Sequence, residues 1–293
     1  MNTDIVIIGA GPAGIFTAME LLRRGSKEKI LLLEKGRSIE TRKCPKAQTG
    51  RCMNCKPYCH ITTGFSGAGA FSDGKLSLSP EVGGDLPQLI GEDTVQSLIE
   101  YTDSIYLEFG ADTRVEGVSE KEAVKEIRKR AIQTGLKLVD CPIRHLGTEK
   151  AQEIYYAIEQ YLLNNGVEIR FGCACSDLIL KNDTCIGVHV AEGQNEYDVY
   201  AKQTVVAAGR RGADWFDKLC ARHGIAHAPG TVDIGVRVEV PNSIMDHLTQ
   251  HLYEAKLVYY ADTFENKVRT FCMNPGGIVS EEHYDGEDGG IAV

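Results

Sequence analysis

The spacing of apolar and polar residues predicts that the chain opens with a strand, a helix and a second strand. Residues 5–8 form an unbroken apolar run rich in β-branched side chains, which is typical of a strand buried on both faces. A helical pattern follows and ends at residues 23–25, where two arginines precede a glycine. A second apolar run occupies residues 30–33 and ends at Glu34. This order predicts a parallel βαβ unit.

Two amphipathic helices are expected near the middle of the chain. The first begins with Ser119 as its cap and has apolar residues at helical spacing, which are Ala123, Ile127 and Ala131. The second has Thr148 as its N-cap and stops at Asn165-Gly166. Its apolar stripe is expected to face a core and consists of Ile154, Ala157, Ile158 and Tyr161.

Strands are predicted in the second half of the chain. They fall within VEIRFGCACSDLILKNDTCIGVHV, and a further buried strand at residues 205–208 is followed by Gly209. From about Thr231 three more segments have the character of strands, VDIGVRVEV, KLVYYADTF and VRTFCM. We expect these last three to form a mixed or antiparallel sheet.

Glycines stand between the first strand and the first helix at the spacing that binds a dinucleotide. Gly9, Gly11 and Gly14 form G-x-G-x-x-G, with Pro12 and Ala13 inside the motif. Gly9 makes the tight turn, Gly11 lets the backbone approach a pyrophosphate, and Gly14 lets helix and strand pack closely. The start of the helix offers N–H groups and a positive dipole end to that pyrophosphate.

An acid completes this predicted site. Glu34 lies twenty residues after Gly14, at the tip of the second strand, and is followed by Lys35. Its carboxylate can accept both ribose hydroxyls of an adenosine and would repel a 2′-phosphate, so NADP is not expected. A glycine-rich turn that only packs is the alternative interpretation. The register of strand, helix, second strand and acid favours a dinucleotide.

The fingerprint does not separate FAD from NAD, but later segments favour FAD. The stretch YDVYAKQTVVAAGRRG resembles the strand that closes the FAD domain in oxidoreductases of the glutathione-reductase-like superfamily. The segments at 64–76, 141–151 and 269–277 are similar to the bacterial FAD-dependent dehydrogenases, also called NAD(P)/FAD-dependent oxidoreductases. The resemblance implies FAD and a redox reaction. It also implies site roles for the backbone near Cys175, which would flank the adenine, and for Ala208 and Gly209. His145 is a site candidate by the same resemblance, and the alternative is a hydrogen-bonded histidine in a turn.

The glycine loop at residues 64–76 has a second chemical interpretation. Gly69, Gly74 and Lys75 match an ATP phosphate loop, but Leu76 stands where Ser or Thr would hold magnesium, and Asp73 puts a carboxylate in the cradle. A loop that faces the flavin is favoured, with contacts from Gly67, Ala68, Gly69 and Ala70. Asp73 and Lys75 either orient substrate or flavin, or form a surface ion pair worth under about 1 kcal/mol.

Four cysteines lie close together just before this loop, in KCPKAQTGRCMNCKPYCH. Cys44, Cys52, Cys55 and Cys59 indicate a zinc or iron–sulfur site, a thiol redox pair, or buried packing. The polar, turn-forming surroundings favour metal binding, since such a segment gains order from a metal. Because the segment leads into the glycine loop, it is also a candidate electron conduit to the flavin. His60 either replaces one thiolate or forms an ordinary hydrogen bond.

Composition and charge exclude several function classes. The 293 residues are 43% hydrophobic and 25% charged, which is typical of globular proteins. The formal net charge of −9 argues against a nucleic-acid or anionic-membrane partner. No window approaches the ~20 apolar residues of a membrane span, and the first residues make a poor signal peptide. The ten cysteines are then expected in a cytoplasmic protein as reduced thiols, ligands or redox groups.

The expected fold is α/β, with a Rossmann-like FAD/NAD(P)-binding ββα sandwich and a second, strand-rich substrate domain. Residues 1–80 and 150–230 would form the FAD-binding domain, residues 81–149 a helical linking segment, and residues 231–293 the start of the substrate domain. A second fingerprint is absent from the sequence, so a dedicated nicotinamide domain is not expected. The closing strand of the resembled family is also absent. We therefore expect the first part of a longer protein, with weak FAD affinity on its own.

The function expected from the sequence is an FAD-dependent oxidoreductase. It would exchange hydride or electrons with a small-molecule substrate or an electron donor or acceptor. Two alternatives stay open, which are an NAD-binding enzyme with zinc in the cysteine segment and a non-enzymatic, dinucleotide-binding thiol redox sensor. The sequence assigns no catalytic acid or base.

Overall fold

A computed structural model of the chain divides it into two compact units. Unit 1 comprises residues 1–72, 151–235 and 280–293, and unit 2 comprises residues 73–150 and 236–279. The described residues are 1–71, 74–118, 121–228, 230, 233–277, 282–283 and 291–292. The segments expected as a linking region and as the start of a substrate domain contribute to the same unit 2.

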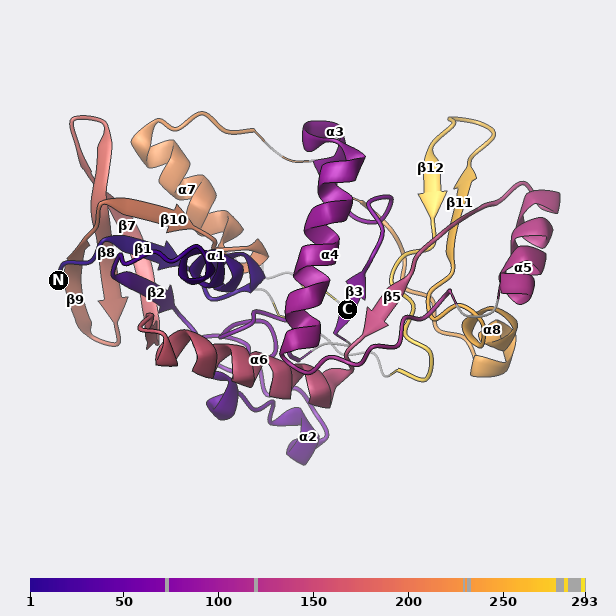
Figure 1. Cartoon of the computed structure of the whole chain (residues 1–293), viewed down its shortest axis with the longest axis horizontal. Coiled ribbons are helices and arrows are strands. Elements are labelled where there is room, and N and C mark those ends of the chain that lie inside the picture. Colours follow the sequence, from indigo (N-terminus) through magenta and orange to yellow (C-terminus); the bar gives the residue numbers. More distant parts are fainter. Residues whose placement is uncertain are drawn as a thin grey trace. The chain divides into compact units, whose positions relative to one another are not determined.

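The centre of unit 1 is a parallel four-stranded sheet (Figure 1). Its order is β10 (Gln203–Val206), β1 (Ile5–Ile8), β2 (Ile30–Glu34) and β6 (Glu168–Phe171). All residues of β1 and β2 are buried, as expected for strands covered on both faces. Between them α1 (Pro12–Arg23) buries Gly14, Ile15, Ala18 and Met19. The predicted βαβ unit is therefore confirmed.

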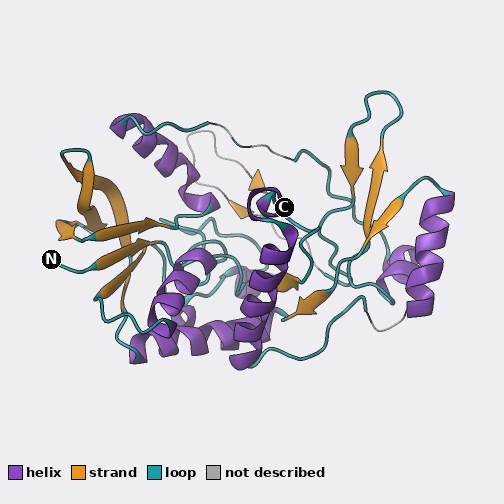
Figure 2. Ribbon diagram, turned by 45° about the horizontal axis from the view of Figure 1, so that its top comes forward, coloured by secondary structure: helices purple, strands orange, loops and turns teal. Residues whose placement is uncertain are grey.

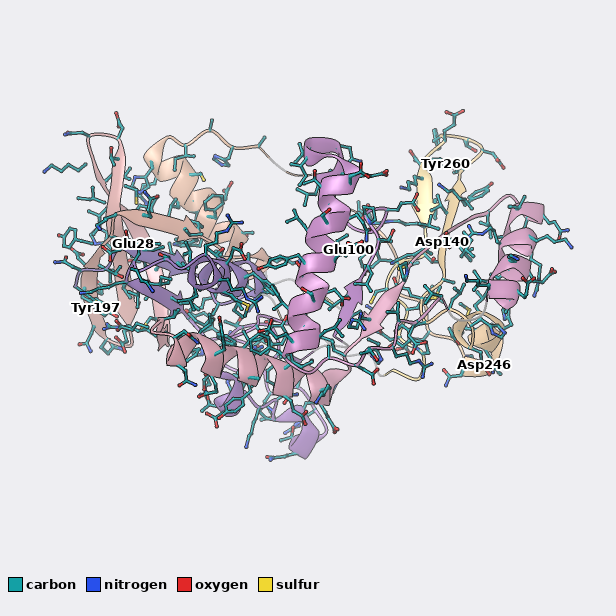
Figure 3. The ribbon with its side chains drawn as sticks, in the orientation of Figure 1. Glu28, Glu100, Asp140, Tyr197, Asp246 and Tyr260 are labelled. Carbon is teal, nitrogen blue, oxygen red and sulfur yellow. The ribbon has the colours of Figure 1, made fainter. Side chains whose placement is uncertain are left out.

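A second sheet packs on the first within unit 1. It is an antiparallel meander of β7 (Cys173–Lys181), β8 (Thr184–Glu192) and β9 (Asn195–Tyr200). Val6 and Leu31 of the parallel sheet share one apolar core with Val188 and Val199 of the meander. The Tyr197 hydroxyl, labelled in Figure 3, accepts a hydrogen bond of 3.1 Å from Arg170 Nη1 of β6. Two sheets and the helix α1 give the predicted α/β FAD-binding fold.

Further helices complete unit 1. α6 (Thr148–Asn164) has a buried face of Ala151, Ile154, Tyr155, Ile158 and Leu162, and it ends just before Asn165-Gly166 as predicted. α7 (Ala213–His223) follows the short η2 (Arg210–Gly212) after β10. The short helix η1 (Ile39–Thr41) precedes the cysteine segment, and α2 (Lys46–Thr49) lies within it. The paired strands β13 (Glu282–His283) and β14 (Ile291–Ala292) lie near the end of the chain.

Unit 2 combines four helices with two small sheets among its described residues (Figure 2). The helices are α3 (Leu86–Ile90), α4 (Glu92–Glu108), α5 (Lys121–Gln133) and α8 (Asn242–Thr249). One antiparallel sheet has the order β12 (Lys267–Arg269), β11 (Lys256–Tyr260) and β4 (Lys137–Val139), and β3 (Lys75–Ser77) pairs with β5 (Ile143–His145). Ile127 and Ala131 of α5 pack on Leu138 of β4, which explains the apolar stripe predicted for this helix. Its predicted cap, Ser119, lies outside the described residues.

Two of the three strand segments predicted after residue 231 are confirmed, and one is wrong. KLVYYADTF contains β11, and VRTFCM overlaps β12. The described part of VDIGVRVEV, residues 233–240, forms no strand, and Ile234 and Val236 are 96% and 88% exposed. The alternating pattern requires a neighbouring strand and a covered face. No strand described by the structure pairs with this segment, so the pattern alone does not produce a strand.

Candidate functional site

The carboxyl ends of the parallel strands meet at one edge of the sheet in unit 1, where most of the predicted site residues gather. The Gly9 N–H donates to the Leu33 carbonyl oxygen at 2.8 Å, and the Ala207 N–H donates to the Ile8 carbonyl oxygen at 2.8 Å. These bonds fix the ends of β1, β2 and β10 side by side. In open α/β sheets this edge is where ligands bind.

Each glycine of the fingerprint has the environment that its predicted role requires. Gly9 has φ +102°, and a Cβ there would lie 2.5 Å from the Ala207 carbonyl oxygen. A Cβ on Gly14 would lie 1.9 Å from the Gly9 carbonyl oxygen, so only glycine permits this contact of helix and strand. A Cβ on Gly11 would meet no heavy atom within 4 Å. Gly11 therefore presents bare backbone to open space, which a ligand can occupy.

The start of α1 is prepared for an anion. Gly11 is its N-cap and makes no side-chain capping bond, Pro12 occupies the first turn, and no acidic residue lies in that turn. The Ile15 N–H makes the first intrahelical bond, to the Gly11 carbonyl oxygen at 3.0 Å. The N–H groups of Ala13 and Gly14 precede that bond, and together with the helix dipole they favour a negatively charged ligand.

Glu34 is buried beside this turn, with 6% of its surface exposed. Its Oε2 accepts the Ala10 N–H at 2.9 Å, and its Oε1 accepts the Gly36 N–H at 2.7 Å. A carboxylate offers about four lone-pair positions, so two backbone bonds leave acceptor capacity for ligand hydroxyls. The two bonds hold the carboxylate in one orientation before any ligand arrives.

The glycine loop lies directly against the fingerprint. The Ser66 N–H donates to the Ala10 carbonyl oxygen at 2.7 Å. A Cβ on Gly67, whose φ is +59°, would lie 3.8 Å from the Gly11 Cα. Gly67, Ala68 and Gly69 are half-buried, whereas Ala70 is fully buried in the core. The structure thus brings two segments more than fifty residues apart in sequence to the same turn.

Two buried hydroxyls have no hydrogen-bond partner among the described residues, Thr62 Oγ1 and Thr63 Oγ1. The backbone of Thr63 lies close to Gly36, because a Cβ on Gly36 would lie 2.7 Å from the Thr63 carbonyl carbon. Buried polar groups are normally satisfied by protein, water or ligand. The surroundings of Glu34 therefore fit a polar ligand.

The remaining predicted cofactor residues divide into two groups. Ala208 contacts Gly9, with its Cα 3.3 Å from the Cβ position of that glycine, and Gly209 follows with φ +58°. Lys35 Nζ donates to the Arg211 carbonyl oxygen at 3.1 Å and lies 4.9 Å from the centre of the Tyr58 ring. Cys175 instead lies near the start of β7, opposite Val190. Burial raises the pKa of its thiol to about 12, so this side chain behaves as part of the core.

Sequence reasoning missed Arg42, which is 2% exposed. Its Nε donates to the His60 carbonyl oxygen at 2.9 Å, its Nη2 to the Ile61 carbonyl oxygen at 2.6 Å, and its Nη1 to Phe65 and Ser66. Burial lowers the pKa of Arg42 to about 10, although the charge of Glu34 opposes the shift. Nothing in the sequence around Arg42 separates it from an exposed arginine, so no local pattern could have identified it.

The four cysteines of residues 44–59 are free thiols. Cys52 is exposed, and the other three are half-buried. The Asn54 N–H donates to Cys52 Sγ at 3.4 Å, which shapes the C-x-x-C turn. Burial raises the pKa of Cys55, and the neighbouring thiols add to the shift. Among the residues that the structure describes, no group of three or more His, Cys, Asp or Glu side chains could hold a metal ion, so metal binding stays a prediction.

His60, the alternative ligand in that segment, is engaged elsewhere. Its Nδ1 lies 2.8 Å from the Lys43 carbonyl oxygen, which is the ordinary hydrogen bond that the sequence allowed for. The bond spans the cysteine segment from one side to the other. His60 therefore closes the base of the segment.

Two further candidates lie in unit 2. Lys75 Nζ contacts Glu254 Oε2 at 2.9 Å and the Met273 carbonyl oxygen at 2.8 Å. Its proposed partner Asp73 lies outside the described residues. His145 Nε2 is 3.3 Å from the Tyr253 hydroxyl, and the two rings stack with their centres 4.6 Å apart. These side chains form a polar cluster within unit 2 that the sequence did not connect.

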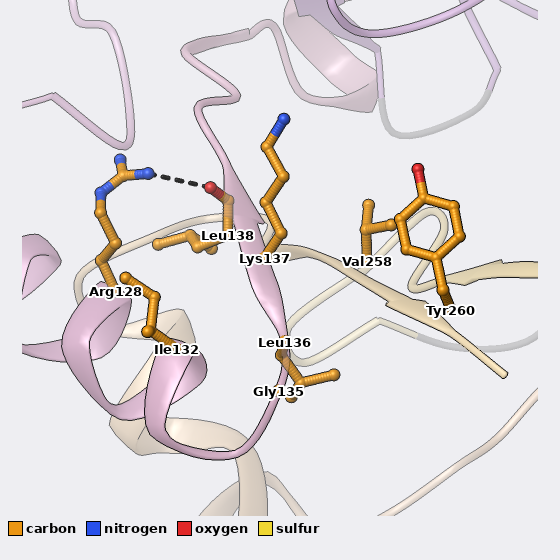
Figure 4. A pocket seen from close by; sticks show the side chains of 8 residues that line it. All are labelled: Arg128, Ile132, Gly135, Leu136, Lys137, Leu138, Val258 and Tyr260. Carbon is orange, nitrogen blue, oxygen red and sulfur yellow. Dashed lines mark hydrogen bonds between the residues drawn. The ribbon is translucent and has the colours of Figure 1, made fainter. Parts of the chain in front are cut away.

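Unit 2 also contains a pocket of about 350 Å³ (Figure 4). Ile132, Leu136 and Val258 give it an apolar lining, and Arg128 Nη1 donates to the Leu138 carbonyl oxygen at 2.9 Å. No cysteine, histidine or carboxylate lines it. Its ionisable side chains are those of Arg128, Lys137 and Tyr260.

None of the helices that the structure describes combines the length and hydrophobicity needed to cross a bilayer.

Comparison with known proteins gives a match to the family described as FAD binding domain, over residues 56–233, which is more than half of the chain. An uncharacterised protein from Clostridium beijerinckii is 24% identical over 283 residues, covering 94% of this chain and 45% of the relative. The chain thus spans less than half the length of that relative.

Several solved structures are distantly similar. An L-amino acid deaminase from Proteus vulgaris is 17% identical, with 74% of this chain and 56% of that chain covered and a TM-score of 0.44. A glycine oxidase from Bacillus cereus is 17% identical, with 75% and 58% covered and a TM-score of 0.41. A 3-ketosteroid dehydrogenase from Rhodococcus jostii is 15% identical, with 76% and 48% covered and a TM-score of 0.46.

Proposed function

Because this chain belongs to the FAD binding domain family, we propose that it is an FAD-dependent oxidoreductase. It transfers hydride or electrons between FAD and a small-molecule substrate. The bound flavin supplies the redox chemistry, while the protein binds and orients the cofactor. The observation that carries the proposal is the open backbone of Gly11 at the start of α1, with Gly67 of the glycine loop beside it.

The residues at the sheet edge fit the parts of FAD. Gly11, Ala13 and Gly14 would hold the pyrophosphate through backbone N–H groups. Glu34 would accept the ribose hydroxyls, since its two backbone bonds leave acceptor capacity. The same charge disfavours a 2′-phosphate. Residues 67–69 would face the flavin side of the cofactor, whereas Ala70 is buried in the core, and Ala208 and Gly209 would line the turn from β10.

The substrate belongs to unit 2 in this proposal. The polar cluster of Lys75, Glu254, His145 and Tyr253 supports that assignment, because it brings several ionisable side chains together and its Lys75–Glu254 pair is largely buried. We assign no catalytic acid or base among them. The substrate is a small molecule or an electron donor or acceptor.

A cysteine-bound zinc or iron–sulfur centre forms a second, finer part of the proposal. Cys44, Cys52, Cys55 and Cys59 lie within sixteen residues of the chain, and none of the four is fully buried. Thiolates are suitable ligands for zinc or iron. Among the described residues the thiols do not lie close enough together to hold a metal ion, so binding would require them to move toward one another. We therefore assign no electron-transfer step to it. Protein purified anaerobically and lacking both zinc and iron would remove this part of the proposal.

The cofactor assignment is tested by Gly11→Ala. The added methyl meets no atom of the protein within 4 Å and the backbone at Gly11 has φ −76°, so the fold should tolerate it. It would block backbone approach of the pyrophosphate. Losing one charge-assisted hydrogen bond worth ~1.5–3 kcal/mol should weaken FAD binding about tenfold or more.

Gly235→Ala is the matched control, because its Cβ also meets nothing within 4 Å. FAD affinity is measured by quenching of flavin fluorescence, and the thermal unfolding midpoint checks the fold. NAD is titrated in parallel. Binding of NAD without FAD, or equal FAD affinity in both variants and the wild type, contradicts the proposed function.

A further inference from the structure

One buried side chain joins the cysteine segment to the cradle, by which we mean the fingerprint at residues 9–14, Glu34 and the glycine loop. Arg42 Nε and Nη2 donate to the carbonyl oxygens of His60 and Ile61, at 2.9 and 2.6 Å. These two residues directly follow Cys59, the last of the four cysteines. The guanidinium group therefore fixes the point where the cysteine segment ends.

The same guanidinium group holds the glycine loop. Arg42 Nη1 donates to the Phe65 carbonyl oxygen and lies 3.3 Å from Ser66 Oγ. The Ser66 N–H in turn donates to the Ala10 carbonyl oxygen at 2.7 Å, inside the fingerprint. A continuous series of hydrogen bonds thus runs from Ile61 through Arg42 and Ser66 to Ala10.

The packing beside Arg42 is tight at Gly64 and Gly36. A Cβ on Gly64 would lie 2.5 Å from Arg42 Cδ, and a Cβ on Gly36 would lie 2.5 Å from the Gly64 backbone nitrogen. Gly36 also donates its N–H to Glu34. Because protein interiors are close-packed, a shift of the Arg42 side chain must move Gly64, and with it the turn that holds Glu34.

We propose that Arg42 is a positioning residue that couples the four thiols of residues 44–59 to FAD binding. The inference rests on the proposed function. FAD in the cradle holds residues 66–67 against the fingerprint, Arg42 then holds residues 60–61, and the thiols become less reactive. Because coupling between two sites is reciprocal in free energy, covalent modification of the thiols in turn weakens FAD binding.

The test measures alkylation of individual cysteines by iodoacetamide in the whole chain, with and without saturating FAD. Mass spectrometry gives a rate for each cysteine. FAD should slow alkylation of Cys55 and Cys59 at least about fivefold, the lower end of typical coupling. Cys272, which is exposed in unit 2, is the internal control and should keep its rate. Protein alkylated only at the four cysteines of residues 44–59 should bind FAD at least about fivefold more weakly.

Arg42→Lys keeps the charge but cannot reach all the acceptors of the guanidinium group. It should reduce the protection of Cys55 and Cys59 by FAD to below about twofold while FAD still binds. Arg24→Lys, at an exposed arginine paired with Glu20, is the matched control and should keep the full protection. If Arg42 only stabilises the structure, Arg42→Lys should raise the alkylation rates equally with and without FAD. The ratio of the rate without FAD to the rate with FAD would then be the same as in the wild type.

The outcomes separate the two proposals. If FAD binds but neither slows alkylation nor binds the alkylated wild type more weakly, the coupling is wrong and the proposed function stands. Full protection in a folded Arg42→Lys variant also overturns the role of Arg42. If Arg42→Lys does not fold, the two wild-type measurements decide. If FAD does not bind at all, both proposals fail.

Discussion

Glu34→Gln tests whether one buried carboxylate both shapes the cradle and binds the ribose. In the wild type each carboxylate oxygen accepts a backbone N–H, from Gly36 at 2.7 Å and from Ala10 at 2.9 Å. The amide keeps one acceptor oxygen and turns an NH₂ group toward the other N–H. One hydrogen bond to a charged group is lost, and a buried N–H is left unsatisfied. We expect a loss of about 2 kcal/mol in the free energy of unfolding without cofactor.

The same variant should bind FAD more weakly by a separate effect. An amide offers fewer acceptor positions than a carboxylate, so a ribose hydroxyl loses a charge-assisted bond worth ~1.5–3 kcal/mol, which is about 10- to 150-fold in Kd. Urea unfolding without FAD measures the loss of stability, and a fluorescence titration with FAD in buffer without urea measures the loss of affinity. Glu20→Gln is the control, because the Glu20–Arg24 pair is exposed and worth about 0.5 kcal/mol or less. Unchanged FAD affinity in Glu34→Gln, with normal binding loss in Gly11→Ala, would refute the role of Glu34 in ribose binding.

Two further predictions concern stability. Gly14→Ala should destabilise the protein by about 3 kcal/mol or prevent folding, because its Cβ would lie 1.9 Å from the Gly9 carbonyl oxygen; urea unfolding measures this, and wild-type stability would disprove the close helix–strand contact. Burial raises the pKa of Glu159 in the folded protein. Above about pH 4 the carboxyl group ionises in the unfolded chain while it stays protonated in the folded protein, so the free energy of unfolding of the wild type should fall as the pH rises toward the folded pKa. Glu159→Gln removes that fall while its oxygen can still accept the Ile39 N–H; a stability difference between variant and wild type that is the same at pH 4 and pH 7 would contradict the explanation.

Local patterns predicted the helix and strands that carry the candidate site. The fingerprint glycines lie within six residues, and β1 and α1 follow from apolar runs of ordinary length. Glu34 was predictable because the βαβ unit fixes where the second strand ends. Each of these features depends on neighbours in sequence, which is the information that a hydrophobic pattern contains.

Features made by distant contacts were not predictable in the same way. The Lys75–Glu254 pair joins residues 179 positions apart, and no pattern links them. The strand expected at VDIGVRVEV failed for the same reason, since alternation specifies a face but not the partner that covers it. The metal interpretation of the cysteine segment depended on spacing, whereas ligand geometry depends on how the loop folds.

The burial of Arg42 follows from the irregular backbone that the site requires. Residues 60–66 must approach the fingerprint closely, and Gly64 and the turns there prevent a regular strand ladder. Their carbonyl oxygens then need donors from a side chain, because each buried unsatisfied acceptor costs ~1–3 kcal/mol. An apolar residue of similar size could fill the space but would leave His60, Ile61 and Phe65 without donors. A guanidinium group supplies several donors from one position, and its buried charge is stabilised by the nearby Glu34 carboxylate.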